Sequence, residues 1–430
     1  MGRKVDINVP VLTRVEGEGA LELKVRKNKV KKLRLRIYEP PRYFEKFLEG
    51  RHFDEVPDLV ARICGICPVA YQVSAVNAFE SLFEIELPPW VEAMRRVMYC
   101  GEWLESHALH IHLLALPDLF GYSNGVAMAK DYPEEIGRGL RLQALGNDLM
   151  RLLGARSVHP VGIKVGGFYR APDPGEVGHM LTRLQKALPE ARALVQWLSV
   201  IEHPRIPQDF TSVALRSEYG YAINDGRLVS SHGLDIHSDA YADYFEEYQV
   251  PHSTALWSHL EGNPYLVGPL ARLNMNAVQL GADCGDGFNG LLQRFPSNDM
   301  FDSMLARGLE ICWALSEAER LLSNYQIPRS PSVPVSPKAG VGNGWSEAPR
   351  GLLWHRYEIN KKGLIRSARI VPPTSQNQAR IEQDLHYSLQ QFGLDREPDE
   401  LQQLCEQVIR NYDPCISCAT HFLKLKLDSR

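Results

Sequence analysis

The order of apolar and polar residues predicts strands near the N-terminus and a long helix further along. Residues 5–39 alternate apolar with charged side chains, and a Lys-Asn pair separates two such runs, LELKVRKN and KVKKLRLRIYE. This alternation predicts paired β-strands, because successive side chains of a strand point to opposite faces of a sheet. Residues 174–201 instead place apolar side chains such as Val177, Leu181 and Leu184 at helical spacing, which predicts an amphipathic helix.

Further helices are expected on both sides of that segment. Residues 41–50, led by proline and ended by glycine, and residues 53–62 predict two short helices. The middle of the chain, residues 204–265, is rich in glycine, tyrosine and histidine and predicts irregular structure with short strands. Longer helices are expected in the remaining periodic segments, which are 68–83, 90–116, 133–153, 296–325, 376–391 and 396–410.

Two adjacent segments in the last third of the chain have contrasting patterns. Residues 330–351 are rich in proline, glycine and serine and, taken in isolation, resemble a linker. Residues 352–373 predict a β-hairpin around Lys361-Lys362-Gly363. Without a repeat or a low-complexity tract, the whole pattern predicts a mainly α protein with small β-sheets near both ends, an α+β fold. No domain boundary stands out, so residues 1–430 are expected to form a single domain, with residues 1–40 as its N-terminal strands.

The composition excludes some classes of protein. Hydrophobic residues make up 44% of the chain, enough for a sizeable core. Basic residues number 48 and acidic residues 52, so the chain lacks the basic bias typical of nucleic-acid-binding proteins. The sequence has no run of about 18 apolar residues that would predict a membrane span, and its N-terminus lacks the apolar core of a secretory signal. We therefore expect a cytoplasmic protein.

Four of the eight cysteines form two Cys-x-x-Cys pairs, Cys64/Cys67 and Cys415/Cys418. In a long chain without a secretory signal, such pairs are typical of metal or redox sites rather than disulfides. Pro68 suits the first turn of a helix, and a helix N-terminus favours the thiolate form that binds metals. The four other cysteines are expected to be small buried hydrophobic residues; they are Cys100, Cys284, Cys312 and Cys405.

The distance between the two pairs along the chain limits the kind of site. Structural zinc sites usually combine pairs that lie close together in sequence, whereas these pairs lie near opposite ends of a long chain. Four thiolates gathered from such distant segments imply a site at the centre of the fold. A structural zinc site and independent redox disulfides remain alternatives on the residues alone.

The segments around both pairs resemble a known family. RICGICPVAY and DPCISCATH are similar to the two signatures that hold the metal centre of nickel–iron hydrogenase large subunits. TRVEGEG, YFEKFLEGR, HALHIHLLALPD, EAPRGLLWH and VPPTSQNQ resemble further blocks of that family in the same order, so the resemblance spans nearly the whole chain. It is strongest to the cytosolic, bidirectional, NAD(P)-linked branch. It implies a bundle of long helices around a central metal site and reversible heterolytic cleavage of H₂ to protons and electrons.

The resemblance also implies metal ligands. All four paired cysteines would bind nickel, and Cys67 and Cys418 would also bridge to an iron that carries carbon monoxide and two cyanide ligands. Soft thiolates suit both metals. Glu45 and His421 resemble the ligands of a further metal ion in the family, often magnesium.

Several other residues receive roles by the same resemblance. Glu16 would relay protons from a nickel-bound thiolate. Arg350 would lie over the open metal position, oriented by Asp118 and Asp413. Without the resemblance, these residues would be interpreted as a salt-bridging glutamate, a loop arginine, a turn residue and a helix N-cap.

Three further positions complete the predicted surroundings of the metals. Pro349 precedes Arg350, and Thr374 lies in a segment that resembles the loop near the cyanide ligands, although the extra Pro373 makes its register ambiguous. Tyr71 replaces a histidine that many relatives carry four residues after the second cysteine of the first pair. A tyrosine hydroxyl donates a similar hydrogen bond but does not titrate near neutral pH. Three clustered histidines are expected to be satisfied core residues rather than ligands; they are His107, His110 and His112.

The resemblance finally implies processing and partners. Residues 422–430, FLKLKLDSR, resemble an extension that a maturation protease removes after His421 once nickel-insertion proteins have acted. The chain has no spare cysteine cluster with iron–sulfur spacing, so an iron–sulfur small subunit is expected, with diaphorase subunits that bind flavin and NAD(P). A hydrogen-sensing regulatory hydrogenase and a catalytically inert relative from respiratory complex I are the alternative functions; the latter lacks the four cysteines.

Overall fold

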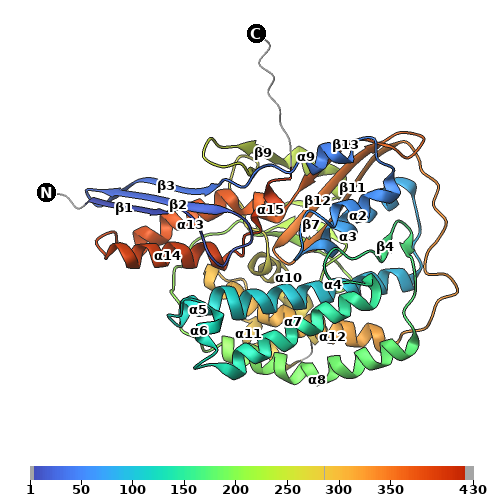
Figure 1. Cartoon of the computed structure of the whole chain (residues 1–430), viewed down its shortest axis with the longest axis horizontal. Coiled ribbons are helices and arrows are strands. Elements are labelled where there is room, and N and C mark those ends of the chain that lie inside the picture. Colours follow the sequence, from blue (N-terminus) through green and yellow to red (C-terminus); the bar gives the residue numbers. More distant parts are fainter. Residues whose placement is uncertain (1–3, 285, 422–430) are drawn as a thin grey trace, which may run out of the picture.

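A bundle of long helices forms one side of the protein in the computed structural model, which describes residues 4–284 and 286–421 (Figure 1). Helix α4 packs against α7, and α12 packs against both α4 and α8. The apolar residues at helical spacing are the ones that are buried, for example Val177 and Leu184 in α8. The four helices are α4 (Pro89–Leu109), α7 (Pro133–Gly154), α8 (Pro174–Leu198) and α12 (Ser303–Ser323).

Two glycines set the close approach of α4 and α7. A Cβ atom at Gly146 would lie 2.5 Å from the backbone nitrogen of Glu105 and 2.6 Å from the carbonyl oxygen of Gly101. A Cβ atom at Gly101 would in turn lie 2.9 Å from the carbonyl oxygen of Gly146. The two helix backbones therefore touch where neither residue has a side chain.

We expect Gly146→Ala to destabilise the protein by about 1–3 kcal/mol, because the added methyl group would force two packed backbones apart. The matched control is Gly178→Ala in α8, where a Cβ atom would meet nothing within 4 Å. Since alanine favours helix over glycine, the control should stabilise the protein by about 0.5–1 kcal/mol. Thermal unfolding midpoints of the two variants should move in opposite directions; a shift of the same sign would contradict the packing argument.

The N-terminal strands are confirmed and form an antiparallel sheet in the order β1-β2-β3. Leu21, Leu23 and Val25 of β2 are fully buried, as their alternation predicts. Lys27 and Asn28 both have positive φ, of 50° and 57°, which suits the tight turn of a hairpin. Figure 1 shows this sheet extending from the body beside α13 and α14. The bounds are β1 (Lys4–Val9), β2 (Gly19–Arg26), β3 (Lys29–Ile37), α13 (Pro373–Phe392) and α14 (Pro398–Asn411).

A second sheet, in the order β11-β12-β13, corrects the prediction of a linker. Its strands are β11 (Gly340–Ala348), β12 (Gly351–Ile359) and β13 (Ile365–Val371), so the second half of residues 330–351 is a strand. Cβ atoms at Gly342 and Gly344 would lie 2.2 Å from the carbonyl oxygen of Ala78 and 2.4 Å from that of Ser74, both in α3 (Pro68–Phe83). The glycines of this segment therefore permit close packing against a helix. The hairpin formed by β12 and β13 is confirmed.

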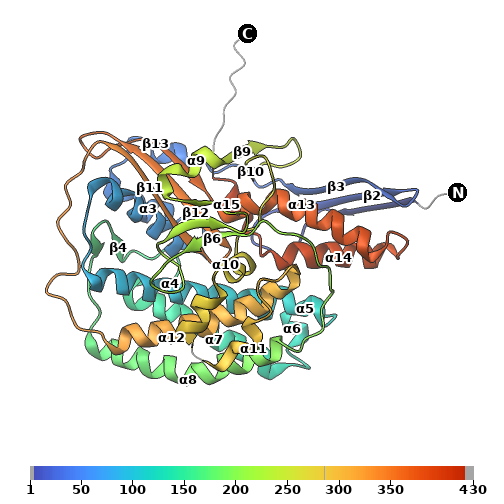
Figure 2. The ribbon, with the colours of Figure 1, turned by 180° about the vertical axis from the view of Figure 1, so that it is seen from behind.

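Helix α10 (Pro269–Cys284) was not predicted, and its helical period is broken at Asn276, whose φ is −137°. Figure 2 shows it near the centre of the molecule, between β6 and α12. Small sheets occur in the middle of the chain as well as near its ends. Their strands are β4 (Ile163–Lys164), β5 (Gly167–Phe168), β6 (Val213–Arg216), β7 (Arg227–Ser230), β8 (Asp235–Ile236), β9 (Phe245–Gln249) and β10 (Leu256–Leu260).

The predicted fold class, mainly α with small antiparallel sheets, is confirmed. Helix α4 continues through a π-helical turn, His110–Ala115. Among the described residues, no helix is both long and apolar enough to cross a membrane. The short helices are α1 (Phe44–Leu48), α2 (Val56–Val60), α5 (Leu116–Leu119), α6 (Gly125–Met128), α9 (Tyr241–Tyr244), α11 (Asn289–Leu292) and α15 (Ile416–Ala419).

Candidate metal centre

The two cysteine pairs meet in the interior. The sulfur of Cys64 lies 3.4 Å from that of Cys415, and the sulfur of Cys67 lies 3.6 Å from that of Cys418. All four sulfurs lie within 4.8 Å of one another and all four residues are buried. Segments at opposite ends of the chain therefore form one cluster, with donors of the kind that soft transition metals prefer.

Side chains from two distant segments hold the two cysteine loops. Arg42 donates hydrogen bonds to the carbonyl oxygens of Ile63, at 2.6 Å, and Ser417, so it ties one loop to the other. The Thr374 hydroxyl accepts the N–H of Cys415 at 2.9 Å. This contact places Thr374 beside the cluster.

The helix that follows Cys67 is also anchored. Glu102 of α4 accepts hydrogen bonds from the N–H groups of Val69 and Ala70 at 2.6 and 3.2 Å. These are unpaired donors of the first turn of α3, so a buried carboxylate caps the helix that begins at the cluster.

The electrostatics of the cluster fit a metal cation. Hydrogen bonds from the Cys415, Cys418 and Cys67 thiols hold the pKa of Cys64 well below its usual range. Burial first, and then the neighbouring sulfurs of Cys418, Cys64 and Cys67, raise the pKa of Cys415 well above its usual range. Four adjacent sulfurs cannot all ionise in a buried site without compensating positive charge, which a bound metal supplies.

Glu16 lies at the sulfur of Cys415. Its Oε2 atom is 3.1 Å from that sulfur and accepts the N–H of Ser417 at 3.0 Å. The carbonyl oxygen of Glu16 accepts the N–H of Ile416, also at 3.0 Å, so the two segments are bridged through their backbones. The neighbouring Glu18, by contrast, is exposed. Glu16 thus offers a half-buried carboxylate in contact with the cluster.

Arg350 and Asp413 form a buried pair beside the cysteines. The Nε and Nη2 groups of Arg350 donate to the carbonyl oxygen and Oδ1 of Asp413 at 2.7 and 3.1 Å. Burial alone would lower the pKa of Arg350, but Asp413 and the sulfurs of Cys415, Cys67 and Cys64 raise it well above its usual range. Among the described residues, Nη1 of Arg350 has no hydrogen-bond partner. A charged donor therefore remains free next to the four sulfurs.

The predicted partner of Asp118, Arg350, is corrected by the structure. Asp118 instead accepts hydrogen bonds from Arg410, at 2.8 and 2.9 Å, and from Arg14. Asp118 follows the π-helical turn that ends α4, and this turn directs it toward the segment containing Arg14. Because Arg14 precedes Glu16 by two residues, Asp118 anchors the segment that presents Glu16.

Glu45 and His421, the residues expected at a second metal site, lie close together. Nε2 of His421 lies 3.6 Å from Oε1 of Glu45 and 2.7 Å from the carbonyl oxygen of Ile370. Burial opposes a charged imidazole, but the Glu45 carboxylate outweighs it and raises the pKa of His421. A carboxylate, a carbonyl and an imidazole, completed by waters, suit a hard divalent cation. The predicted extension, residues 422–430, lies outside the described residues.

Tyr71 lies in the interior next to the cysteines. Tyr71 is fully buried, its ring lies 5.6 Å from that of His355, and its hydroxyl has no hydrogen-bond partner among the described residues. Burial first, and then the negative sulfurs of Cys418 and Cys67, raise the pKa of Tyr71 well above its usual range. It therefore stays protonated.

The three clustered histidines are buried core residues. His107 contacts Glu310 at 2.9 Å, His110 contacts the carbonyl oxygen of Arg410 at 2.8 Å, and His112 contacts that of Ala108 at 2.9 Å. Burial lowers their pKa values to about 4, 3 and 4. The unpaired cysteines are buried, except that Cys284 is only partly so.

Sequence reasoning missed three charged residues near the centre. Glu102 caps α3, and Glu105 lies one turn further along α4. Burial raises the pKa of Glu105 to about 7. Gln143 and Arg350 oppose this rise, and Cys64 adds to it. Arg272 of α10 is fully buried. The usable signal was the presence of charges among the apolar positions of helices, which indicates buried polar networks.

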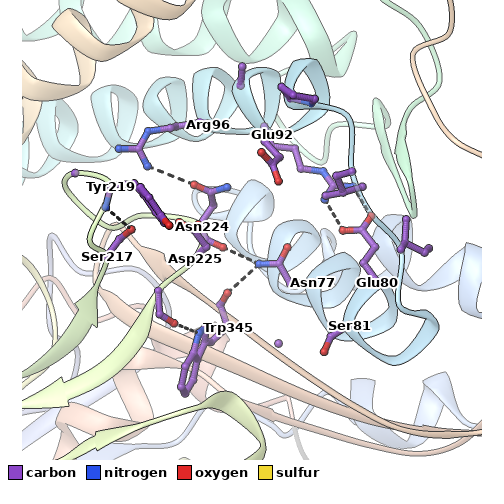
Figure 3. Close-up of a pocket in the computed structure, with 18 of the residues that line it drawn as sticks. Asn77, Glu80, Ser81, Glu92, Arg96, Ser217, Tyr219, Asn224, Asp225 and Trp345 are labelled. Atoms are coloured by element: carbon purple, nitrogen blue, oxygen red, sulfur yellow. Dashed lines mark hydrogen bonds and ion pairs between the residues drawn. The ribbon is translucent and has the colours of Figure 1, made fainter.

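A surface cavity of about 840 Å³ lies apart from this cluster (Figure 3). Figure 3 shows Asn77 among its lining residues, where the amide donates to the carbonyl oxygens of Asn224 and Trp345 at 2.7 and 3.1 Å. The buried pair formed by Glu80 and Arg95 lies in its wall. None of the predicted site residues lines this cavity, so the metal cluster is separate from it.

Comparison with known proteins decides the family. The sequence profile of the family described as nickel-dependent hydrogenase matches residues 42–136 and 257–421, more than half of the chain. The chain belongs to the nickel-dependent hydrogenase family. It is a hydrogenase large subunit, an oxidoreductase, and its four gathered cysteines are positioned for a metal site.

Individual relatives agree with this assignment. The chain is 33% identical to sulfhydrogenase 1 subunit alpha of Pyrococcus furiosus, over 97% of this chain and 98% of that protein. It is 26% identical to the NAD-reducing hydrogenase HoxS subunit beta of Cupriavidus necator, over 98% and 96%. Among solved structures, an NAD⁺-reducing [NiFe]-hydrogenase in the H₂-reduced state matches with a TM-score of 0.88, 27% identity and 97% and 99% coverage.

Proposed function

We propose that this subunit catalyses the reversible heterolytic cleavage of H₂ at a nickel–iron centre and passes the electrons to an iron–sulfur small subunit. The observation that carries the proposal is the buried cluster of four sulfurs with Glu16 on one side and the free Nη1 of Arg350 beside it. A metal site, a proton acceptor and a fixed cationic donor are the parts that such a reaction needs. The gathered cysteines also argue against the inert relative of complex I.

The cysteines divide naturally between two metals. All four would bind nickel, and Cys67 and Cys418, whose sulfurs lie 3.6 Å apart, would be shared with iron. When bound, the metals supply Lewis acidity and redox chemistry. The iron would carry carbon monoxide and two cyanides, with Nη1 of Arg350 as donor to them, and Pro349 and Thr374 nearby. Tyr71 would donate its hydroxyl hydrogen to a sulfur of the cluster.

Protons would leave through Glu16. Its Oε2 atom is 3.1 Å from the sulfur of Cys415, within reach for direct proton transfer. The carboxylate is held in place by the N–H of Ser417 and by the backbone bridge to Ile416. Asp118 supports this route indirectly, because it anchors Arg14 just before Glu16. Asp413 orients the guanidinium of Arg350 on the other side.

The electron acceptor is inferred from relatives. Two proteins similar to this chain along nearly its whole length carry NAD-reducing in their names. We therefore propose diaphorase partners that bind flavin and NAD(P), and a cytoplasmic location. We further propose that residues 1–430 form one large-subunit domain, which becomes active once nickel-insertion proteins have acted and a protease has removed residues 422–430.

An infrared spectrum of the purified native complex tests the metal centre, and hydrogen-dependent reduction of NAD⁺ or NADP⁺ tests the acceptor. Bands of metal-bound carbon monoxide and cyanide, together with nickel and iron in the protein, are expected. Zinc in place of nickel, without those bands, would refute the proposal. A complex with the bands but with a negligible rate of hydrogen turnover would instead favour the hydrogen sensor.

The second metal site gives a separate prediction. Glu45→Gln should lower magnesium affinity by at least about tenfold, the smallest loss typical when a supporting partner of a metal ligand is removed. Bound magnesium would be measured by elemental analysis after dialysis against graded metal concentrations. The matched control is Glu49→Gln, at the C-cap of the same helix, whose only ion-pair partner within the described residues is the exposed Lys46. Equal magnesium content in both variants and the parent would exclude Glu45 as a ligand.

A further inference from the structure

Arg350 belongs to a tight turn between two buried strands. Ala348 of β11 pairs with Gly351 of β12, so Pro349 and Arg350 alone form the connection. A Cβ atom at Gly351 would lie 2.7 Å from the backbone nitrogen of Gly268. One at Gly268 would lie 2.9 Å from the carbonyl oxygen of Arg350. The turn therefore rests directly on the backbone that precedes α10.

Arg272, in the first turn of α10, binds the carbonyl groups of that turn. Its Nη1 donates to the carbonyl oxygen of Ala348 at 2.9 Å, and its Nη2 donates to that of Pro349 at 3.1 Å. Nη1 also donates to the carboxylate of Glu347 at 3.2 Å. Three successive residues before Arg350 are thus held by one guanidinium.

The rest of the guanidinium is held equally firmly. Nε and Nη2 donate to the two carboxylate oxygens of Glu310 at 2.7 and 2.8 Å, so all five N–H groups of Arg272 have acceptors. The group also lies 4.3 Å from the ring centre of Trp103. Arg272 and Glu310 are both fully buried.

Glu310 is itself fixed from two other elements. It accepts the hydroxyl of Tyr221 at 2.6 Å and contacts His107 of α4 at 2.9 Å. Burial alone would raise the pKa of Glu310, but Arg272 holds it at about 2. The carboxylate is therefore a stable anchor for the guanidinium. Arg272 connects α4, α10 and α12 to the turn that presents Arg350.

We propose that Arg272 is a positioning residue for Arg350. It fixes the backbone carbonyls just before Arg350, so that the Arg350 side chain reaches Asp413 with Nη1 left free beside the cysteines. The inference rests on the proposed function, because it concerns how accurately Arg350 is placed for hydrogen cleavage.

Lysine cannot replace this arginine. Its single nitrogen offers three N–H donors without the planar arrangement that serves five acceptors. In the complete hydrogenase complex, Arg272→Lys should lower kcat by about 10- to 100-fold, the effect expected when a catalytic group shifts by about 1 Å. The KM for hydrogen should stay within about twofold, because the lost interaction does not bind substrate.

Arg95→Lys is the matched control. Arg95 lies in α4, is 1% exposed, and forms a two-point ion pair with Glu80 at 2.6 Å, but it does not contact the turn. It should lose a comparable amount of stability while kcat changes by less than about twofold. A kcat loss in Arg95→Lys equal to that in Arg272→Lys would reduce Arg272 to a general structural role and overturn the inference.

A double-variant cycle gives the decisive result. If Arg272 acts through Arg350, then Arg272→Lys should lower kcat by less than about twofold in an Arg350→Lys background. Fold losses that multiply would overturn the inference. If Arg272→Lys does not retain nickel, Glu310→Gln replaces it in the cycle. This variant weakens the hold on the Arg272 guanidinium without removing it, and the same limit of about twofold applies. An unaltered complex without hydrogen turnover would refute the proposed catalytic function instead.

Discussion

Replacing Cys415 with serine is expected to leave the hydrogenase with little nickel and with no measurable hydrogen turnover. A serine hydroxyl is a hard donor that stays protonated at neutral pH, whereas the site gathers four sulfurs within 4.8 Å of one another. Cys415 also holds the sulfur that contacts Glu16. Its loss would therefore remove both a proposed metal ligand and the first atom of the proposed proton route.

Nickel and iron content per subunit, together with hydrogen-dependent dye reduction, would measure this effect. The matched control is Cys405→Ser in α14, which also replaces a fully buried cysteine. Burial raises the pKa of Cys405 to about 12, so it is an inert thiol. The control should keep its metals and most of its activity. A Cys415→Ser protein with full nickel content would rule out Cys415 as a ligand.

Glu16→Gln should produce a different defect, in which the metals stay bound but turnover falls about 100- to 10,000-fold. Glutamine retains the shape of the side chain and an oxygen that can accept the N–H of Ser417, but it cannot accept a proton from the sulfur of Cys415. Isotope exchange between D₂ and water would measure proton transfer at the site without requiring electron transfer to partners.

Glu18→Gln is the control for this experiment, because Glu18 is the exposed carboxylate two residues away. It should retain full isotope exchange. If Glu16→Gln also exchanged at the parent rate with intact metal content, protons would have to leave by another route. The buried Glu105, whose pKa lies at about 7, would then be the next residue to test.

Elements with a strong local pattern were predicted well. The N-terminal sheet followed from alternation, and α3, α7 and α8 from helical period, because burial of one face selects a matching repeat of apolar residues. Helix α10 was missed because its period breaks at Asn276. The strand β11 was mistaken for a linker because its glycines serve contacts with α3, and those contacts are invisible in a local pattern.

The sequence by itself determined the chemistry of this protein. Two cysteine pairs at opposite ends, with their flanking motifs, specified a soft metal site and identified Glu16, Arg350, Glu45 and His421 as candidates. Residue type and motif decide which atoms a site can contain, and both can be read directly from the amino-acid sequence.

Only the tertiary structure decided which of these residues touch. It joined Glu16 to Cys415, assigned Asp118 to Arg14 and Arg410 instead of Arg350, and revealed Arg272 behind the turn. These contacts join residues that are between 77 and 399 positions apart in the sequence. They depend on how α4, α10 and α12 pack, which local patterns of apolar and polar residues do not encode.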